Sequence, residues 1–414
     1  MKDVTKRCIL SLALVLTNTV GTVAQVAFPQ RDSISGVRVN DSGSFIGNKS
    51  YDLGNTEEKE VNKKRIRPIV YYSNPDRIFA GVKFTLARGT LGYSPTGYDQ
   101  SLQLRYSISQ NAFSVLYDGN FYRLFGNWNA SVNAYYDWMV WTNYFGLGND
   151  SRMTGPLTDY RLTTGEYAVN LGINRLINRY HYLELTAYGE GIEVFPSSGS
   201  FVKDNSLGDG GYFSEHRLYA GIKGGYTYQR VDDNILPQRG VMLYAGAGYT
   251  YNTYNASRSF ADYSGIAQFY IPLPAKLSLS LRAGGSGVIG TPEFFQYVST
   301  GGPLTIRGYR RDRFWGDVAF YNSNELRYIT DIKIKKYSGK IGPVVFFDDG
   351  RVWIRNESSN TLHYGYGGGL LLSPMHMFTA YATYAVSPEG GLLQFKVTKL
   401  LGKIPPTRGR QVKE

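Results

Sequence analysis

The chain has 414 residues, of which 19% are charged and 15% are aromatic, and its formal net charge is +12. A nucleic-acid-binding protein can be this basic, but here the Lys and Arg residues are scattered apart from one dense run over 57–67, which argues against that function. The mean hydropathy of -0.29 excludes a bundle of apolar membrane-spanning helices. The 35 Tyr and 48 Gly residues favour antiparallel strands, because a Tyr ring suits a boundary between apolar and polar surroundings.

The start of the chain has the pattern of a secretion signal. Basic residues precede an apolar stretch at 8–20, and small residues follow at 22–24. We therefore expect a signal peptide over 1–24 and Gln25 as the first mature residue. An N-terminal membrane anchor is the alternative, but the stretch is short for a span. Cys8 is the only cysteine and lies inside this signal, so the mature chain would have no thiol and no Cys-ligated metal.

Residues 25–65 are polar and show no clear period. The first part reads as loop, and the charged run at 57–65 is either loop or a short solvated helix. About 40 residues are too few for a periplasmic domain of ordinary size. The sequence therefore predicts a short periplasmic leader.

From residue 66 to residue 402 apolar and polar residues alternate with a period of two, which is typical of strands with one apolar and one polar face. Most stretches reach the length that a tilted membrane strand needs, whereas a soluble β-sandwich, the main alternative, usually has strands of about five or six residues. The fold class is therefore all-β, a single transmembrane antiparallel β-barrel of about sixteen strands. The expected strands lie near 67–73, 78–88, 99–109, 112–124, 127–138, 159–171, 180–194, 215–228, 240–252, 260–271, 276–289, 317–329, 339–352, 362–373, 376–386 and 389–398.

Loop lengths predict an orientation. If the N-terminus is periplasmic, odd-numbered connections face outward, and the longest ones, 139–158, 195–214 and 290–316, are the fifth, seventh and eleventh. Several even-numbered connections are very short, although 89–98 and 229–239 are longer. This asymmetry is expected of outer-membrane barrels.

A motif in the eleventh connection indicates a particular protein family. Residues 301–309 read Gly-Gly-Pro-Leu-Thr-Ile-Arg-Gly-Tyr, and two further motifs follow, Asn-Glu-Leu-Arg-Tyr at 324–328 and Phe-Phe-Asp-Asp-Gly-Arg-Val-Trp at 346–353. The last four residues of the first motif, called the tetrad below, resemble the aliphatic-Arg-Gly-aromatic signature in the sixth outer loop of the bacterial surface antigen family, the BamA/TamA-type assembly and translocation barrels. The later motifs resemble the family's twelfth and thirteenth strands. The tetrad residues are Ile306, Arg307, Gly308 and Tyr309.

The resemblance implies that this loop folds back into the lumen, where Arg307 pairs with Glu325 and Asp348. A guanidinium suits that role, because its planar fork of donors holds a carboxylate in fixed geometry. The alternation around Glu325 places it toward the lumen, but the next strand is apolar on both faces, so Asp349 is an alternative to Asp348. An ordinary solvated loop arginine is the other interpretation of Arg307.

The sequence departs from the family at both ends. BamA-type proteins carry periplasmic POTRA domains that receive clients, and the leader is too short for one, so the resemblance is to a member lacking POTRA domains. Residues 403–414 extend beyond the last expected strand as a basic periplasmic tail, where many barrels end on an aromatic residue.

No motif indicates an enzyme. The four histidines, at 181, 216, 363 and 376, stand in no catalytic or metal-binding pattern, and no phosphate loop, zinc motif or calcium loop occurs, so we expect no cofactor and no metal. The predicted function is assembly or translocation in the outer membrane of a Gram-negative bacterium, or partner docking; a passive channel for small solutes is the alternative. The expected partners are outer-membrane lipids, lipopolysaccharide and a periplasmic protein or lipoprotein that replaces the POTRA domains, with no nucleic acid.

Overall fold

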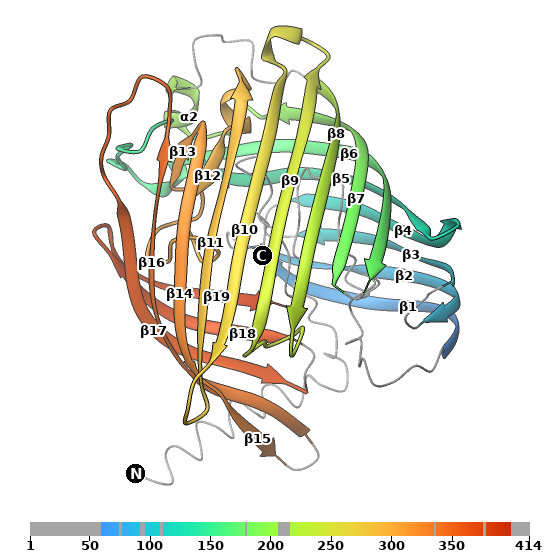
Figure 1. The fold of residues 1–414 in the computed structure, drawn as a ribbon. Helices are drawn as coiled ribbons and strands as arrows, with labels where there is room; N and C mark the ends of the chain where they lie inside the picture. Colours follow the sequence, from blue (N-terminus) through green and yellow to red (C-terminus); the bar gives the residue numbers. More distant parts are fainter. Residues whose placement is uncertain are drawn as a thin grey trace.

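A computed structural model describes residues 59–73, 77–91, 96–107, 111–178, 180–205, 216–334, 337–375 and 378–398. The expected signal peptide, the leader up to residue 58 and the basic tail at 403–414 lie outside the described residues. Seventeen strands form one antiparallel sheet that curves into a barrel (Figure 1), and two short strands form a separate hairpin. Within the described part of the chain, no helix has the length and hydropathy that crossing a membrane requires.

The wall sheet contains, in chain order, β1 (Lys59–Ser73), β2 (Arg77–Leu91), β3 (Thr96–Ser107), β4 (Ala112–Phe125), β5 (Trp128–Asn143), β6 (Arg161–Asn178), β7 (His181–Val194), β8 (His216–Val231), β9 (Gly240–Asn252), β10 (Phe260–Pro272), β11 (Leu277–Gly290), β14 (Val318–Tyr328), β15 (Thr330–Ile334), β16 (Tyr337–Trp353), β17 (His363–Pro374), β18 (Thr379–Ser387) and β19 (Gly390–Thr398). Each strand from β1 to β11 and from β16 to β19 pairs with the next one in sequence, and β11 pairs with β14 across the connection that holds the hairpin. β14 and β15 pair with β16 in one continuous register, so together they occupy a single position in the wall. Among the pairings of the described residues, β1 has β2 as its partner and β19 has β18, and none joins β1 to β19.

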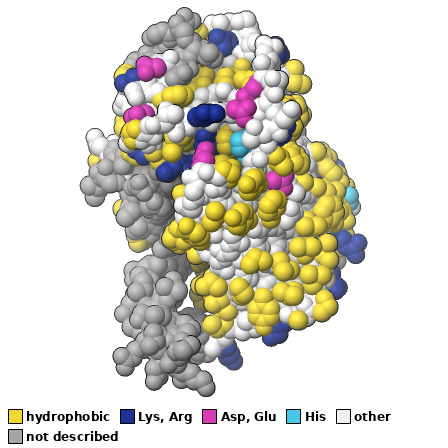
Figure 2. Space-filling model, turned by 90° about the vertical axis from the view of Figure 1, so that its left-hand side faces the viewer, with side chains coloured by type: hydrophobic (Ala, Val, Ile, Leu, Met, Phe, Trp, Pro, Cys, Tyr) yellow, Lys and Arg dark blue, Asp and Glu magenta, His cyan; other side chains and the backbone are white. Residues whose placement is uncertain are grey.

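The wall has a polar inner face and an apolar outer face. On β3, Gln103 is 1% exposed, whereas its neighbour Leu104 is 43% exposed. The same inversion of a soluble protein's pattern recurs along most of the other wall strands, and Figure 2 shows hydrophobic side chains covering a broad area of the outer wall. Apolar residues facing outward suit a lipid environment, and a soluble sandwich would bury them instead.

The first strand begins earlier than the sequence predicts. β1 starts at Lys59 and pairs with β2 from Lys59↔Leu91 onward, so the expected boundary between leader and barrel at residue 66 is too late, and the described part of the charged run, from Lys59, forms strand rather than loop or helix. Side chains at 62–66 are exposed on both faces of the strand. Backbone groups make the pairing there. Because apolar and polar residues do not alternate in this stretch, the sequence gives no sign of a strand.

The connections after β5, β7 and β11 emerge at one end of the barrel, because neighbouring strands are antiparallel. This is the upper end in Figure 1, where the short helix α2 (Ser200–Asn205) also lies. The connection between β11 and β14, residues 291–317, is called the inserted segment below. It contains a 3-10 turn, η4 (Phe294–Gln296), and the hairpin of β12 (Val298–Thr300) with β13 (Phe314–Gly316).

Candidate functional site

The inserted segment makes a tight turn at the predicted tetrad. Gly308 has a φ of 93°, a conformation that L side chains rarely adopt. A Cβ at this position would lie 3.0 Å from the Cβ of Ser387 and 3.1 Å from the backbone carbon of Val386, both on β18. Glycine is therefore required here both for the backbone turn and for the close approach to the wall.

The turn directs Arg307 onto the inner faces of β14 and β16. Its side chain is buried, with Nε 2.6 Å and Nη2 2.7 Å from the two carboxylate oxygens of Asp348, and Nη1 2.6 Å from Oε1 of Glu325. Nη2 also donates to the hydroxyl of Ser323 at 3.1 Å, and the backbone N–H of Arg307 donates to Asp348 at 3.0 Å. The ring of Phe346 covers the guanidinium, with its centroid 3.6 Å from Cζ.

The charges in this site balance. Glu325 also accepts from Arg327, with Nη2 to Oε2 at 2.5 Å, so two guanidinium groups meet two carboxylates, those of Glu325 and Asp348. We call these four residues the Arg307 network. Burial alone would lower the pKa of Arg307, but the two carboxylates outweigh it and hold that pKa above its ordinary value. A buried, neutral and hydrogen-bonded network fixes the geometry of the segment against the wall.

The structure brings all six predicted site residues together. Ile306 and Tyr309 are buried on either side of the Arg307–Gly308 turn, in one hydrophobic cluster. Asp349, the alternative partner, does not contact Arg307; its carboxylate lies on the other face of β16 and accepts from Asn322 at 3.4 Å.

Two contacts of the tetrad were missed from the sequence. Gln394 of β19 accepts from the Gly308 N–H at 3.2 Å and donates to the Tyr309 carbonyl at 3.0 Å. Ser387 of β18 donates to the Gly308 carbonyl at 2.8 Å. The tetrad therefore touches the last two strands as well as β14 and β16. A polar residue on a period-two strand marks only the inner face, so the sequence held no sharper signal for either contact.

At the upper end, the inserted segment is joined to other connections. Arg313 is buried and bonds to the carboxylate of Glu389 at 2.7 Å and to the carbonyl of Ser151 at 2.6 Å. Asn149, in the connection after β5, donates to the Thr361 carbonyl at 2.8 Å and accepts from the Val352 N–H at 3.0 Å. Segments from four different connections are thus held together over this end of the barrel.

These features define the class of protein, an antiparallel β-barrel with a polar inner face, an apolar outer face and a connection bonded to the inner face of the wall through a buried arginine. The Omp85 superfamily domain matches residues 83–388, and the chain belongs to this superfamily. No curated protein sequence matches the chain.

Solved structures of the superfamily share the fold. BamA from Haemophilus ducreyi lacking POTRA domains 1–3 is 14% identical, with a TM-score of 0.60, over 82% of this chain and 70% of that one. CdiB from Escherichia coli is also 14% identical, with a TM-score of 0.50, over 91% of this chain and 73% of that one. The described residues of this chain all belong to the barrel wall and its connections.

Proposed function

We propose that this protein is a barrel of sixteen wall positions in the bacterial outer membrane, and that it acts in the assembly or translocation of other polypeptides. Its inserted segment, the sixth outward connection, closes the lumen. The Arg307 network carries this proposal, because a buried guanidinium that meets two carboxylates holds the segment across the interior. An open porin has no need of such an attachment.

The ends of the sheet supply the surface for a client. Within the described residues β1 pairs with β2 and β19 pairs with β18, which makes these two strands the ends of the sheet, and the edge of an end strand is a template for another strand. Leu393 and Phe395 of β19 expose their side chains beside this edge. A nascent outer-membrane strand would add to β19 by backbone pairing and leave the barrel sideways into the lipid.

Orientation and partners follow from the same arrangement. The upper end, with its long and mutually bonded connections, faces outward, and the short turns face the periplasm. A periplasmic protein or lipoprotein would deliver clients to the short-turn end. The proposed activity needs no catalytic group and no cofactor, since strand exchange makes and breaks only noncovalent contacts.

Site-specific photo-crosslinking tests the assembly function. A photoreactive residue at Phe395 should form an adduct with an unfolded outer-membrane barrel protein added to the purified protein in liposomes. The matched control is Tyr384 of β18, which is similarly exposed but one strand away from the edge. Equal adducts at both positions, or none at Phe395, would remove the support for a client site at the seam.

A passive solute channel is the second candidate, and one observation favours it. The inner faces of β3–β6 carry a ladder of polar side chains, which suits a water-filled passage. The members that oppose one another across these strands are Ser101, Asp118, Asn133 and Asn170. Such a channel would conduct steadily, whereas a closed barrel conducts little.

A further inference from the structure

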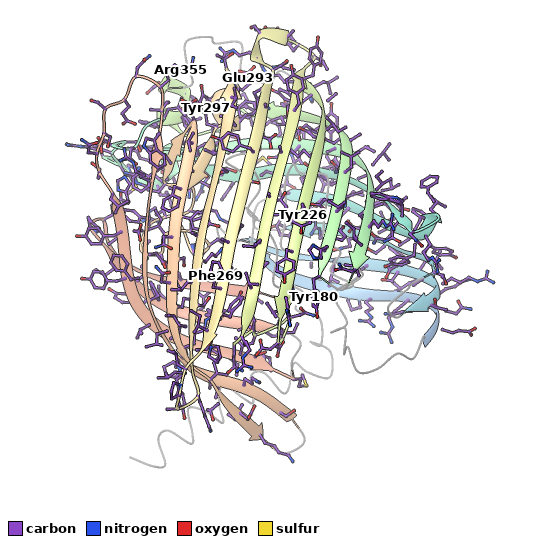
Figure 3. All side chains as sticks on the ribbon, in the orientation of Figure 1. Tyr180, Tyr226, Phe269, Glu293, Tyr297 and Arg355 are labelled. Atoms are coloured by element: carbon purple, nitrogen blue, oxygen red, sulfur yellow. The ribbon has the colours of Figure 1, made fainter. Side chains whose placement is uncertain are left out.

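A second buried carboxylate holds the inserted segment, at its other end and on other strands. Glu293 is 0% exposed and precedes η4. Its Oε1 accepts from Nη1 of Arg217 on β8 and from Nδ2 of Asn252 on β9, each at 3.2 Å. Arg258 lies 3.9 Å from its other oxygen, and the Gln296 side chain accepts from the Glu293 N–H. Figure 3 shows Glu293 near the upper end of the barrel.

The hydrophobic residues near the two attachments pack in different clusters. The root of the segment, Phe294, Phe295 and Trp315, packs with Ile192 and Val194 of β7. The tip of the segment packs with β10, β11, β14 and β16 instead; it comprises Val298, Ile306, Tyr309 and Phe314. Tyr297, labelled in Figure 3, packs against both clusters and joins root to tip.

The polarity of the two attachments is reversed. At the tip the segment supplies the cation, Arg307, and the wall supplies the carboxylates. At the root the segment supplies the carboxylate, Glu293, and the wall supplies the cation, Arg217. The wall site at the tip is therefore negatively charged and the wall site at the root is positively charged. When one attachment breaks, the segment residue of the other attachment cannot take its place, because it carries the wrong charge for that site.

We propose that Glu293 is a positioning residue that fastens the root of the inserted segment to β8 and β9 independently of the Arg307 network. Release of Arg307 then frees the tip alone, which swings about a fixed root, and the lumen opens fully only when both attachments break. This inference rests on the proposed function in one respect, that the inserted segment closes the lumen.

Cysteine accessibility tests the independence of the two attachments. Val194→Cys reports on the root cluster and Val352→Cys on the tip cluster; both valines are buried at the upper ends of their strands, β7 and β16, at 1% and 0% exposure. In a Cys8→Ser background no native thiol reacts. Arg307→Ala should make position 352 react with a soluble maleimide while position 194 stays protected, and Glu293→Gln should do the reverse. Equal exposure of both positions by Arg307→Ala, or no exposure of position 194 by Glu293→Gln, would overturn the proposal.

The chain offers a matched control in Asp262→Asn. Asp262 of β10 pairs with Lys223 of β8 at 3.0 Å, across Gly248 of β9, and is as buried as Glu293. This ion pair joins wall strands to each other and does not involve the inserted segment. Its loss should leave positions 194 and 352 both protected. Labelling at position 194 in this variant would show that any lost charge pair on β8 loosens the root, and the assignment to Glu293 would fail.

Single-channel conductance separates this inference from the proposed function. In Glu293→Gln with Arg307→Ala, the increase in conductance over the native protein should exceed the sum of the increases in the two single variants, whereas the conductance of Asp262→Asn with Arg307→Ala should match that of Arg307→Ala. If labelling follows the expected pattern but the double variant conducts no better, the second attachment stands and the segment is not what closes the lumen. If the double variant does not fold, the labelling of the single variants still decides the inference.

Discussion

Asp348 and Glu325 make different numbers of hydrogen bonds to Arg307. Asp348 accepts three bonds from it, two from the guanidinium and one from the backbone, and Glu325 accepts one while also pairing with Arg327. Loss of Glu325 therefore disturbs two arginines, whereas loss of Asp348 acts mainly on Arg307. Removing one partner of a buried pair costs on the order of 3–5 kcal/mol, and a partly wet lumen favours the lower end.

This asymmetry predicts the outcome of two mutant cycles. Arg307→Ala and Asp348→Asn should each destabilise the folded barrel, and the double variant should cost less than the sum by about 1–3 kcal/mol, measured by equilibrium unfolding in detergent. The coupling of Arg307 with Glu325 should be smaller. Arg307→Lys should recover only part of the loss, because an ammonium lacks the planar fork.

The neighbouring carboxylate provides the control for these cycles. Asp349→Asn removes a charge one residue away but on the other face of β16. It should show no coupling to Arg307→Ala. Additivity for Asp348 as well would mean that the two side chains do not touch.

Substitution of Gly308 should destabilise the barrel in two ways, by backbone strain and by a steric clash with the wall. Gly308→Ala should lower the free energy of unfolding by about 1–3 kcal/mol through its φ of 93°, and by more through the clash with β18. Gly390→Ala is the matched variant, since Gly390 has a φ of 114° but a Cβ there would meet nothing within 4 Å. Thermal unfolding should place Gly308→Ala well below Gly390→Ala, and equal melting temperatures would contradict the packing of the turn against β18.

Residue patterns predicted the tip of the segment but not its root. Arg307 and Glu325 stood out by motif and alternation, and Asp348 stayed open against Asp349 because both faces of its strand are apolar. Glu293 gave no signal, because it lies in a connection without period and its partner Arg217 is 76 residues away in the chain.

At the scale of elements, alternation located the strands and failed where their regularity breaks. The sequence ends the fifth strand at residue 138, but β5 continues to Asn143. Its register with β6 shifts between Asp137 and Val140, and Met139 has a φ of 67°. Such a bulge reverses which side chains face inward, so a reading by strict alternation stops there.

The early start of β1 gives a deletion test. Removing residues 32–58 should leave a folded barrel that shifts its mobility on heating in gel electrophoresis, since the first backbone pair with β2 is Lys59↔Leu91. Extending the deletion through residue 66 removes about half of the β1–β2 ladder and should abolish the folded band. A folded band after the longer deletion would show that these pairs contribute little.

At the scale of the whole molecule, the orientation is open to labelling in intact cells. Met153, in the connection after β5, is exposed at the upper end, and Pro274, in the turn between β10 and β11, is exposed at the other. Met153→Cys should react with an impermeant maleimide on intact cells, and Pro274→Cys only after the outer membrane is opened. The reverse result would mean that the barrel has the opposite orientation in the membrane. Asn149, in the same connection as Met153, is unsuitable for this test because it is buried.

We propose that the inserted segment closes the barrel and that Arg307 holds it there. Single-channel conductance in planar bilayers tests this most directly, with the native protein and Arg307→Ala compared under the same salt and voltage. We expect small, flickering conductance for the native protein and a higher conductance with longer openings for Arg307→Ala. A large, steady conductance in the native protein, unchanged by Arg307→Ala, would contradict it.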